Sequence, residues 1–106
     1  LDKLNILIQD SNVNIIECDG SNERIVVKGR MGTKPTGIIL TKEDIDMVLQ
    51  RFSEASKIPI SEGISKIVVG KLILSAIVSE IVGTKFIIRK MAPIQSAPNQ
   101  RSSPYY

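Results

Sequence analysis

Short runs rich in β-branched and aliphatic residues, with partial alternation at Val13–Cys18, occupy residues 13–40 and 64–90, and hydrophobic residues recur every three to four residues between these stretches. A period of two is typical of β-strands, whereas spacings of three and four indicate an amphipathic helix. The pattern predicts strands at Val13–Cys18, Ile25–Lys28, Gly37–Leu40, Ile64–Val69 and in the two halves of Gly70–Lys90. A short amphipathic helix ending near Gln9 is predicted at the start, where the residues at helical spacing are Leu1, Leu4, Leu7 and Ile8.

The clearest helix start is at Thr41. Its side chain can cap the helix, Asp44 stands where the second partner of a capping box is found, and Leu40 can pack on Ile45. Pro59 sets a limit to the helix. The predicted apolar stripe consists of Ile45, Val48, Leu49, Phe52 and Ala55. Strands on both sides of one capped helix predict an α+β fold with a mainly antiparallel sheet of about six strands.

The stretch Gly70–Lys90 is predicted to be a hairpin that turns at Gly83 and Thr84, because glycine can adopt positive φ. Its first strand carries aliphatic residues on both faces, so both faces are expected to be covered. One face holds Leu72, Leu74, Ala76 and Val78, and the other holds Ile73 and Ile77. In the second strand, Phe86 and Ile88 share one face, while Ile87 and Arg89 share the opposite face. Arg89 is therefore expected at the strand end, on a side that another surface must meet.

Composition removes several classes of chemistry. The chain has no histidine and one cysteine, Cys18, so a zinc site or a Ser-His or Cys-His nucleophile cannot be assembled. A single cysteine fits a reducing compartment, which predicts a cytoplasmic protein, and no run of about 18 apolar residues predicts a membrane span. Gly70-Lys71 is the only Gly-Lys pair and lacks the other residues of a P-loop, so we expect no ATPase site in this chain.

Charge is unevenly divided between the two halves. Residues 1–56 carry a net charge of −2 and residues 57–106 a net charge of +5. A basic half can face phosphates of a nucleotide or a nucleic acid, or can simply be solvated. Residues 91–106 hold three prolines and three serines without periodicity, and are predicted to be a flexible linker or tail after a domain spanning residues 1–90.

Residues 70–90 consist of a glycine, a long apolar strand and then the sequence G-T-x-F-x-I-R-K at residues 83–90. This order resembles the end of the N-terminal domain of type II/IV secretion ATPases. These ATPases are the hexameric motors of secretion systems, type IV pili and archaeal flagella. Other segments resemble the family in the same order: VNIIECDG at 13–20, in the form common in archaeal members, Ile25–Lys28, the helix from Thr41, and SEASKIPIS at 53–61. The resemblance covers about residues 1–92.

The resemblance implies a non-catalytic domain that closes over ATP and Mg²⁺ held by a separate C-terminal motor domain. It also implies contacts with neighbouring subunits of a hexamer and with a membrane platform protein. Basic residues of such domains can reach the nucleotide phosphates, and the candidates here are Arg89, Lys90 and Lys71. A guanidinium such as that of Arg89 can bind phosphate in bidentate fashion. The chain departs from the family at Leu72, where an arginine is common.

Three alternatives belong to other classes. A freestanding basic module can bind nucleic acid, but the basic strands lack the aromatic residues that stack on bases, so nucleic acid is the less expected partner. Gly29-Arg30-Met31-Gly32 matches the G-x-x-G loop of KH domains, although that loop joins two helices and a strand is predicted before it here. The third alternative is a stand-alone protein-interaction domain.

Overall fold

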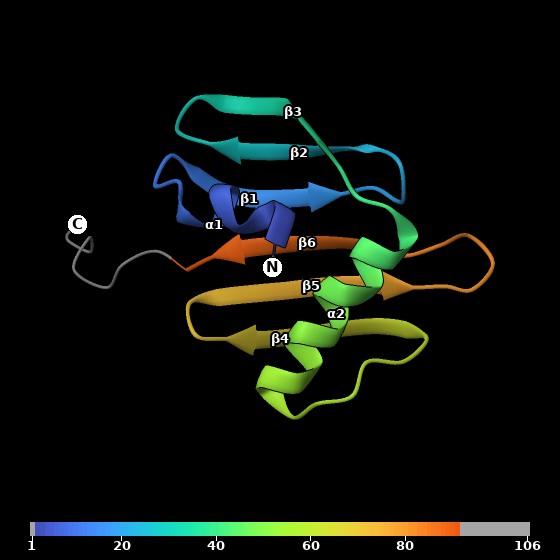
Figure 1. The fold of residues 1–106 in the computed structure, drawn as a ribbon. Helices are drawn as coiled ribbons and strands as arrows, with labels where there is room; N and C mark the ends of the chain where they lie inside the picture. Colours follow the sequence, from blue (N-terminus) through green and yellow to red (C-terminus); the bar gives the residue numbers. More distant parts are fainter. Residues whose placement is uncertain (1, 92–106) are drawn as a thin grey trace, which may run out of the picture.

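Six antiparallel strands form one sheet in the computed structural model, which describes residues 2–91 (Figure 1). The strands are β1 (Val13–Cys18), β2 (Arg24–Gly29), β3 (Gly32–Ile39), β4 (Gly63–Val69), β5 (Leu72–Val78) and β6 (Lys85–Lys90). The helical elements are the 3-10 turn η1 (Asp2–Leu4), α1 (Asn5–Gln9) and α2 (Lys42–Ser56). This arrangement confirms the predicted α+β fold with six strands, a short N-terminal helix and one central helix.

The strand order is β3-β2-β1-β6-β5-β4, so the first and last strands of the chain meet in the middle of the sheet. Ile16 is paired with Ile88 and Cys18 with Phe86 across this central contact. All four side chains are buried. Pairing of strands so distant in sequence fixes β6, the strand with the F-x-I-R-K motif, at the centre of the fold.

Both helices lie on the same face of the sheet (Figure 1). Helix α2 begins with the predicted capping box, in which the Thr41 hydroxyl accepts from the N–H of Asp44 at 3.1 Å and the Asp44 carboxylate accepts from the N–H of Thr41 at 2.9 Å. The helix ends at Ser56, before Pro59, with Lys57 in the left-handed region at φ 63°. Four of the five predicted stripe residues are buried, and Ala55 is exposed.

The hydrophobic core fills the space between the sheet and these helices. It contains Leu4, Val13, Ile16, Cys18, Ile25, Leu40, Ile45, Val48, Leu49, Phe52, Ile67, Leu74, Ala76, Phe86 and Ile88. Leu7 and Ile8 of α1 pack against its edge, which confirms the apolar side predicted for the N-terminal helix. One face of the sheet is therefore covered by this single core.

Three predictions about strands are wrong in detail. Strand β3 begins at Gly32 rather than at the predicted Gly37, because pairing with β2 extends to Gly29 opposite Gly32. Strand β5 ends at Val78, so a six-residue loop, Ser79–Thr84, replaces the tight turn. Among the described residues nothing covers the second face of β5, where Ile77 is 53% exposed. The predicted tail lies outside the described residues, apart from Met91.

Candidate functional site: the open face of the sheet

The face of the sheet opposite the helices is covered by no element of residues 2–91. We call it the open face. Strand register places the following side chains on it: Ile15 and Glu17 of β1, Val26 and Lys28 of β2, Ile64, Lys66 and Val68 of β4, Ile73, Ser75 and Ile77 of β5, and Lys85, Ile87 and Arg89 of β6. The exposed fraction is 84% for Ile64, 53% for Val68 and 37% for Ile87. A contiguous set of exposed aliphatic side chains is typical of an interaction surface.

Arg89 lies on this open face near the end of β6, one of the two central strands of the sheet. Its Cα partners on the neighbouring strands are Ile15 and Ile73, so its side chain emerges between two aliphatic ones. The nearby Lys28 is paired with Glu17 at 2.9 Å, whereas no ion pair within the described residues involves Arg89. Its exposed guanidinium is therefore available to an anion that approaches the open face.

Lys90 faces the opposite way, because successive side chains of a strand alternate between faces. Its Nζ donates to the carbonyl oxygen of Leu7 at 2.8 Å and to that of Asp10 at 2.7 Å. Burial lowers the pKa of the Lys90 ammonium, and the charge of Asp10 acts in the opposite direction. The ammonium thus satisfies two carbonyl groups at the end of α1, and two of its three N–H donors are engaged within the domain.

Lys71 lies in the two-residue turn between β4 and β5, where Gly70 has a φ of 59°. Lys71 is exposed, and its carbonyl oxygen accepts from the N–H of Met91 at 2.8 Å. The adjacent Leu72 pairs with Lys90 and packs against the core. The structure therefore brings the three candidate cations to one end of the sheet but directs them to different places: Arg89 to the open face, Lys90 to the helices and Lys71 to the turn.

Sequence reasoning did not identify the open face as a surface. The signal was present, because β4 and β5 carry aliphatic residues on both faces, but that pattern is equally typical of a strand covered on both sides. Only the positions of the two helices show which face stays uncovered.

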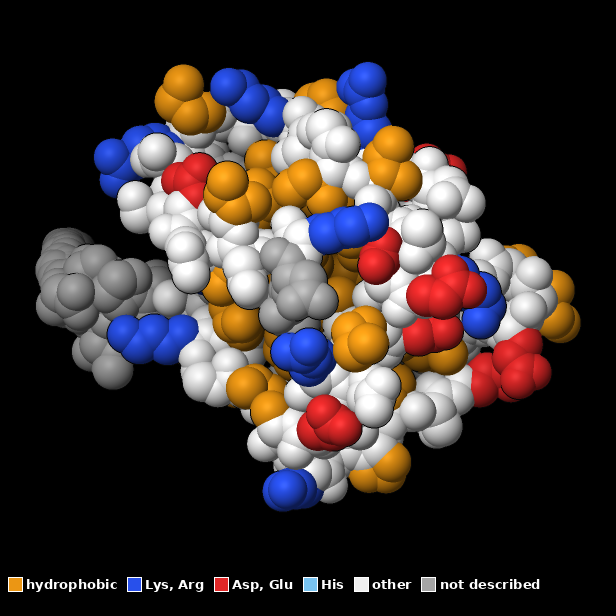
Figure 2. Space-filling view, in the orientation of Figure 1, with side chains coloured by type: hydrophobic (Ala, Val, Ile, Leu, Met, Phe, Trp, Pro, Cys, Tyr) orange, Lys and Arg blue, Asp and Glu red, His pale blue; other side chains and the backbone are white. Residues whose placement is uncertain are grey.

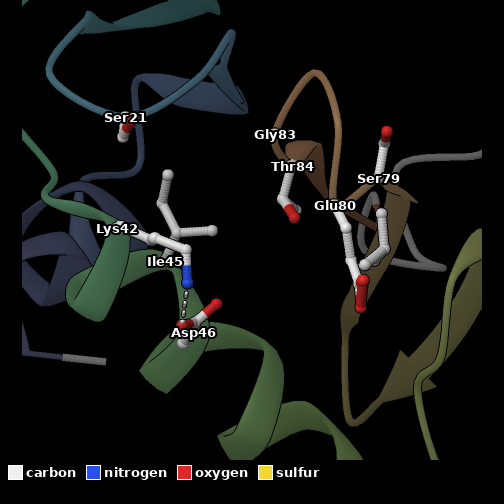
Figure 3. Close-up of a pocket in the computed structure, with 9 residues that line it drawn as sticks. Ser21, Lys42, Ile45, Asp46, Ser79, Glu80, Gly83 and Thr84 are labelled. Carbon is white, nitrogen blue, oxygen red and sulfur yellow. Dashed lines mark hydrogen bonds and ion pairs between the residues drawn. The ribbon is translucent and has the colours of Figure 1, made fainter.

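A separate pocket of about 200 Å³ lies between the first turn of α2 and the loop Ser79–Thr84 (Figure 3). Lys42 and Asp46 form an exposed ion pair at 3.4 Å on the helix side, and Glu80 stands on the opposite side of the gap (Figure 3). Thr41 already binds the N–H of Asp44 at this helix start. Because Lys42 and Asp46 pair with each other on successive turns of α2 and remain solvated, the pocket offers little to orient a ligand.

The sequence Gly29-Arg30-Met31-Gly32 forms the turn between β2 and β3. A KH loop joins two helices, so this turn does not have the structural context that a KH interpretation requires.

Comparison with known proteins gives no identification: no family model and no curated protein matches the chain. Within residues 2–91, no helix has the length and hydrophobicity needed to cross a membrane.

Proposed function

We propose that this chain is the N-terminal, non-catalytic domain of a hexameric secretion ATPase of the archaeal type, and that its open face meets a nucleotide-binding motor domain. The observation that carries the proposal is the position of Arg89, the arginine of the F-x-I-R-K sequence: an exposed cation, unpaired within the described residues, that lies between Ile15 and Ile73 at one end of an uncovered surface rich in aliphatic side chains. In this role the domain closes over ATP and Mg²⁺ bound by the motor domain, and Arg89 stabilises the charge that develops on the phosphates.

The aliphatic character of the open face supports a protein partner. Isoleucine and valine side chains pack against other apolar side chains, whereas binding of single-stranded nucleic acid relies on aromatic stacking. Docking would remove the exposed parts of Val68, Ile77 and Ile87 from water, and each Å² of buried apolar area contributes about 25 cal/mol. The assembly role, docking to a membrane platform and the cytoplasmic location are parts of the same proposal.

Among the three candidate cations, we assign the phosphate contact to Arg89. Lys71 is a second, solvent-exposed point charge at the same end of the sheet. Lys90 has a different role, because its ammonium holds the carbonyl groups of Leu7 and Asp10.

The test is ATP turnover by the complete protein that contains this domain. Removal of a charge-stabilising arginine lowers turnover by about 10³-fold or more in phosphoryl-transfer enzymes, so Arg89→Ala is expected to cause a loss of that order. Arg89→Lys is expected to recover only part of it, because a lysine cannot bind bidentately. Lys34→Ala is the matched control, since Lys34 is an exposed cation of β3 whose partner Val27 packs against the core on the helix side. Equal turnover by Arg89→Ala and Lys34→Ala would contradict the phosphate role.

A further inference from the structure

The sheet ends in two edges of different character, because β3 and β4 are its outer strands (Figure 1). Strand β3 contains Pro35, which has no N–H to donate, and its register with β2 shifts between Arg24 and Val26. Proline and irregular pairing are means by which proteins stop another chain from adding to a sheet. Strand β4 has neither: it contains no proline, and it pairs with β5 without interruption over its seven residues.

The outward backbone groups of β4 belong to Ile64, Lys66 and Val68. The N–H of Met91 donates to the carbonyl oxygen of Lys71 at 2.8 Å, so the odd-numbered residues of β5 direct their backbone groups to β6. The even-numbered residues of β5 therefore bind to β4. Register gives them the partners Gly63, Ser65, Ile67 and Val69. The three residues in between point their N–H and carbonyl groups away from the sheet, and no backbone hydrogen bond of residues 2–91 outside the strand ladders involves them.

The side chains of the same three residues lie on the open face. Ile64 and Val68 are 84% and 53% exposed, and Lys66 is exposed between them. On the helix side, the segment that joins α2 to β4 includes Ile58, which is 50% exposed. Figure 2 shows hydrophobic side chains at the lower margin of the view, near the end of α2. A strand added to β4 can therefore bury apolar side chains on both of its faces.

Charge at this edge favours an acidic partner. The charged residues of β4 and of its flanking segments, 57–62 and 70–71, are Lys57, Glu62, Lys66 and Lys71. The carboxylate of Glu62 accepts from a backbone N–H of the β5–β6 loop at 3.2 Å, whereas no ion pair within residues 2–91 involves the three lysines. Strand β5 carries no charged residue, and the open face of β6 adds Lys85 and Arg89. The carboxylates of Glu17 and Asp19 belong to β1 and the residue after it, on the far side of β5 and β6.

A second copy of this chain does not match the β4 edge. An antiparallel β4–β4 pair that uses all the outward groups places Lys66 opposite Lys66, and like charges directly opposite each other are destabilising. The other outer strand, β3, carries Pro35 and the register shift. Residues 92–106 hold three prolines and no acidic residue. The matching occupant is therefore a strand of a different protein.

We propose that the free edge of β4 binds an extended peptide segment of another protein, in which two aliphatic residues flank an acidic one at alternate positions. The backbone groups of Ile64, Lys66 and Val68 pair with this segment, and Lys66 faces its carboxylate. The segment becomes a new outer strand and extends the open face. This binding role goes beyond the proposed function and does not depend on it, because β5 separates β4 from the strand that carries Arg89.

The first test is binding of a fluorescein-labelled peptide, TVTETVT, to the 106-residue chain, measured by fluorescence anisotropy. The unchanged chain is expected to bind it in preference to the peptide TVTKTVT. Lys66→Glu is expected to weaken binding of TVTETVT by about five- to tenfold and to reverse the preference, because a cross-strand pair of opposite charges becomes a pair of like charges. Lys34→Glu, the same change on the other outer strand, is the matched control and should keep the original preference. Thermal melts establish that each variant remains folded.

Amide hydrogen exchange tests whether the peptide adds to the edge. In the free chain, the N–H groups of Ile64, Lys66 and Val68 are expected to exchange quickly and those of Ser65 and Ile67 slowly, because only the latter two bind β5. Addition of TVTETVT is expected to slow exchange at the first three.

Three results would overturn the proposal: no binding at millimolar peptide, binding that leaves the three outward amides unprotected, or a peptide preference that Lys66→Glu does not change. Pairing of two copies through β4, seen as a concentration-dependent dimer in sedimentation velocity, would also contradict it. These measurements involve neither nucleotide nor a motor domain, so their failure is distinguishable from a failure of the ATP-turnover test of Arg89.

Discussion

Arg89 and Lys90 are adjacent cations with opposite surroundings. Strand geometry sends Arg89 to the open face and Lys90 to the helix side, where its ammonium meets the carbonyl groups of Leu7 and Asp10. The sequence grouped both residues, with Lys71, as candidates for phosphate contact. The alternation of side chains along a strand indicates that two adjacent cations lie on opposite faces of the sheet. Only the position of α1 shows which groups Lys90 binds.

Replacement of these neighbours should therefore have different effects on stability. Lys90→Met leaves two carbonyl groups without their charged donor and is expected to lower the free energy of unfolding by about 1–2 kcal/mol. Arg89→Met removes a solvated cation and should change it by less than about 0.5 kcal/mol. Urea denaturation of the two variants measures both quantities. Equal decreases in the free energy of unfolding would show that the hydrogen bonds of Lys90 to Leu7 and Asp10 do not stabilise the fold.

Asp44 gives the domain a pH-dependent contribution at the start of α2. A hydrogen bond from Lys3 at 2.8 Å, with support from the N–H of Thr41, lowers the pKa of its carboxyl from 3.8 to about 2. The carboxyl binds a proton more readily in the unfolded chain than in the folded one. Its stabilising effect is therefore complete above about pH 4 and is lost as the pH falls toward 2.

Asp44→Asn should consequently be less stable than the unchanged chain at pH 6, and this difference should shrink between pH 4 and pH 2. Denaturant midpoints at several pH values provide the measurement. Asp46→Asn is a suitable control, because the Asp46 side chain is 60% exposed and its one ion pair within residues 2–91 is with Lys42, at 3.4 Å. If the Asp44→Asn difference were the same at pH 6 and pH 2, the capping contact would not explain it.

At the scale of elements, local signals predicted α2 well and β3 poorly. The capping box, the apolar stripe and Pro59 are all local, so the helix could be placed from the sequence. Strand β3 contains Gly32, Pro35 and Gly37, a composition typical of loops, and its pairing with β2 overrides that preference. Sequence reasoning likewise extended β5 beyond Val78, because Ile81 and Val82 continue the apolar pattern although they stand in solvent.

The pairing of β1 with β2 depends on Gly29, which lies one residue beyond the predicted strand Ile25–Lys28 and opposite Val13. A Cβ atom at Gly29 would overlap the carbonyl oxygen of Asn12, which also accepts from the N–H of Arg30 at 3.0 Å. Gly29→Ala is expected to lower the free energy of unfolding by roughly 1–3 kcal/mol, as overpacked sites do.

Gly37→Ala provides the comparison for Gly29→Ala. No atom lies within 4 Å of a Cβ at Gly37, so its substitution should be nearly neutral. Thermal or urea unfolding of the two variants distinguishes them. A neutral Gly29→Ala would mean that Asn12 and Gly29 do not approach as closely as the strand pairing indicates.

For the whole molecule, the main finding is a sheet that is covered on one face only by the described residues. The sequence predicted that both faces of the β5 strand are covered and that Arg89 lies on a side that another surface must meet. The first expectation is wrong within residues 2–91. The sequence alone does not distinguish the two cases, because aliphatic residues on both faces of a strand are compatible with a partner inside the domain or outside it. The proposed contact with a motor domain assigns the second face of the sheet to a partner outside this domain.

The most direct test of this account is the mass of the endogenous protein, detected in its source cells with an antibody against this domain. The proposed motor domain predicts a species several times larger than the 11.7 kDa of this chain, which hydrolyses ATP when purified. A species near 11.7 kDa would contradict the account, because the open face would then have no motor domain in the same chain to meet.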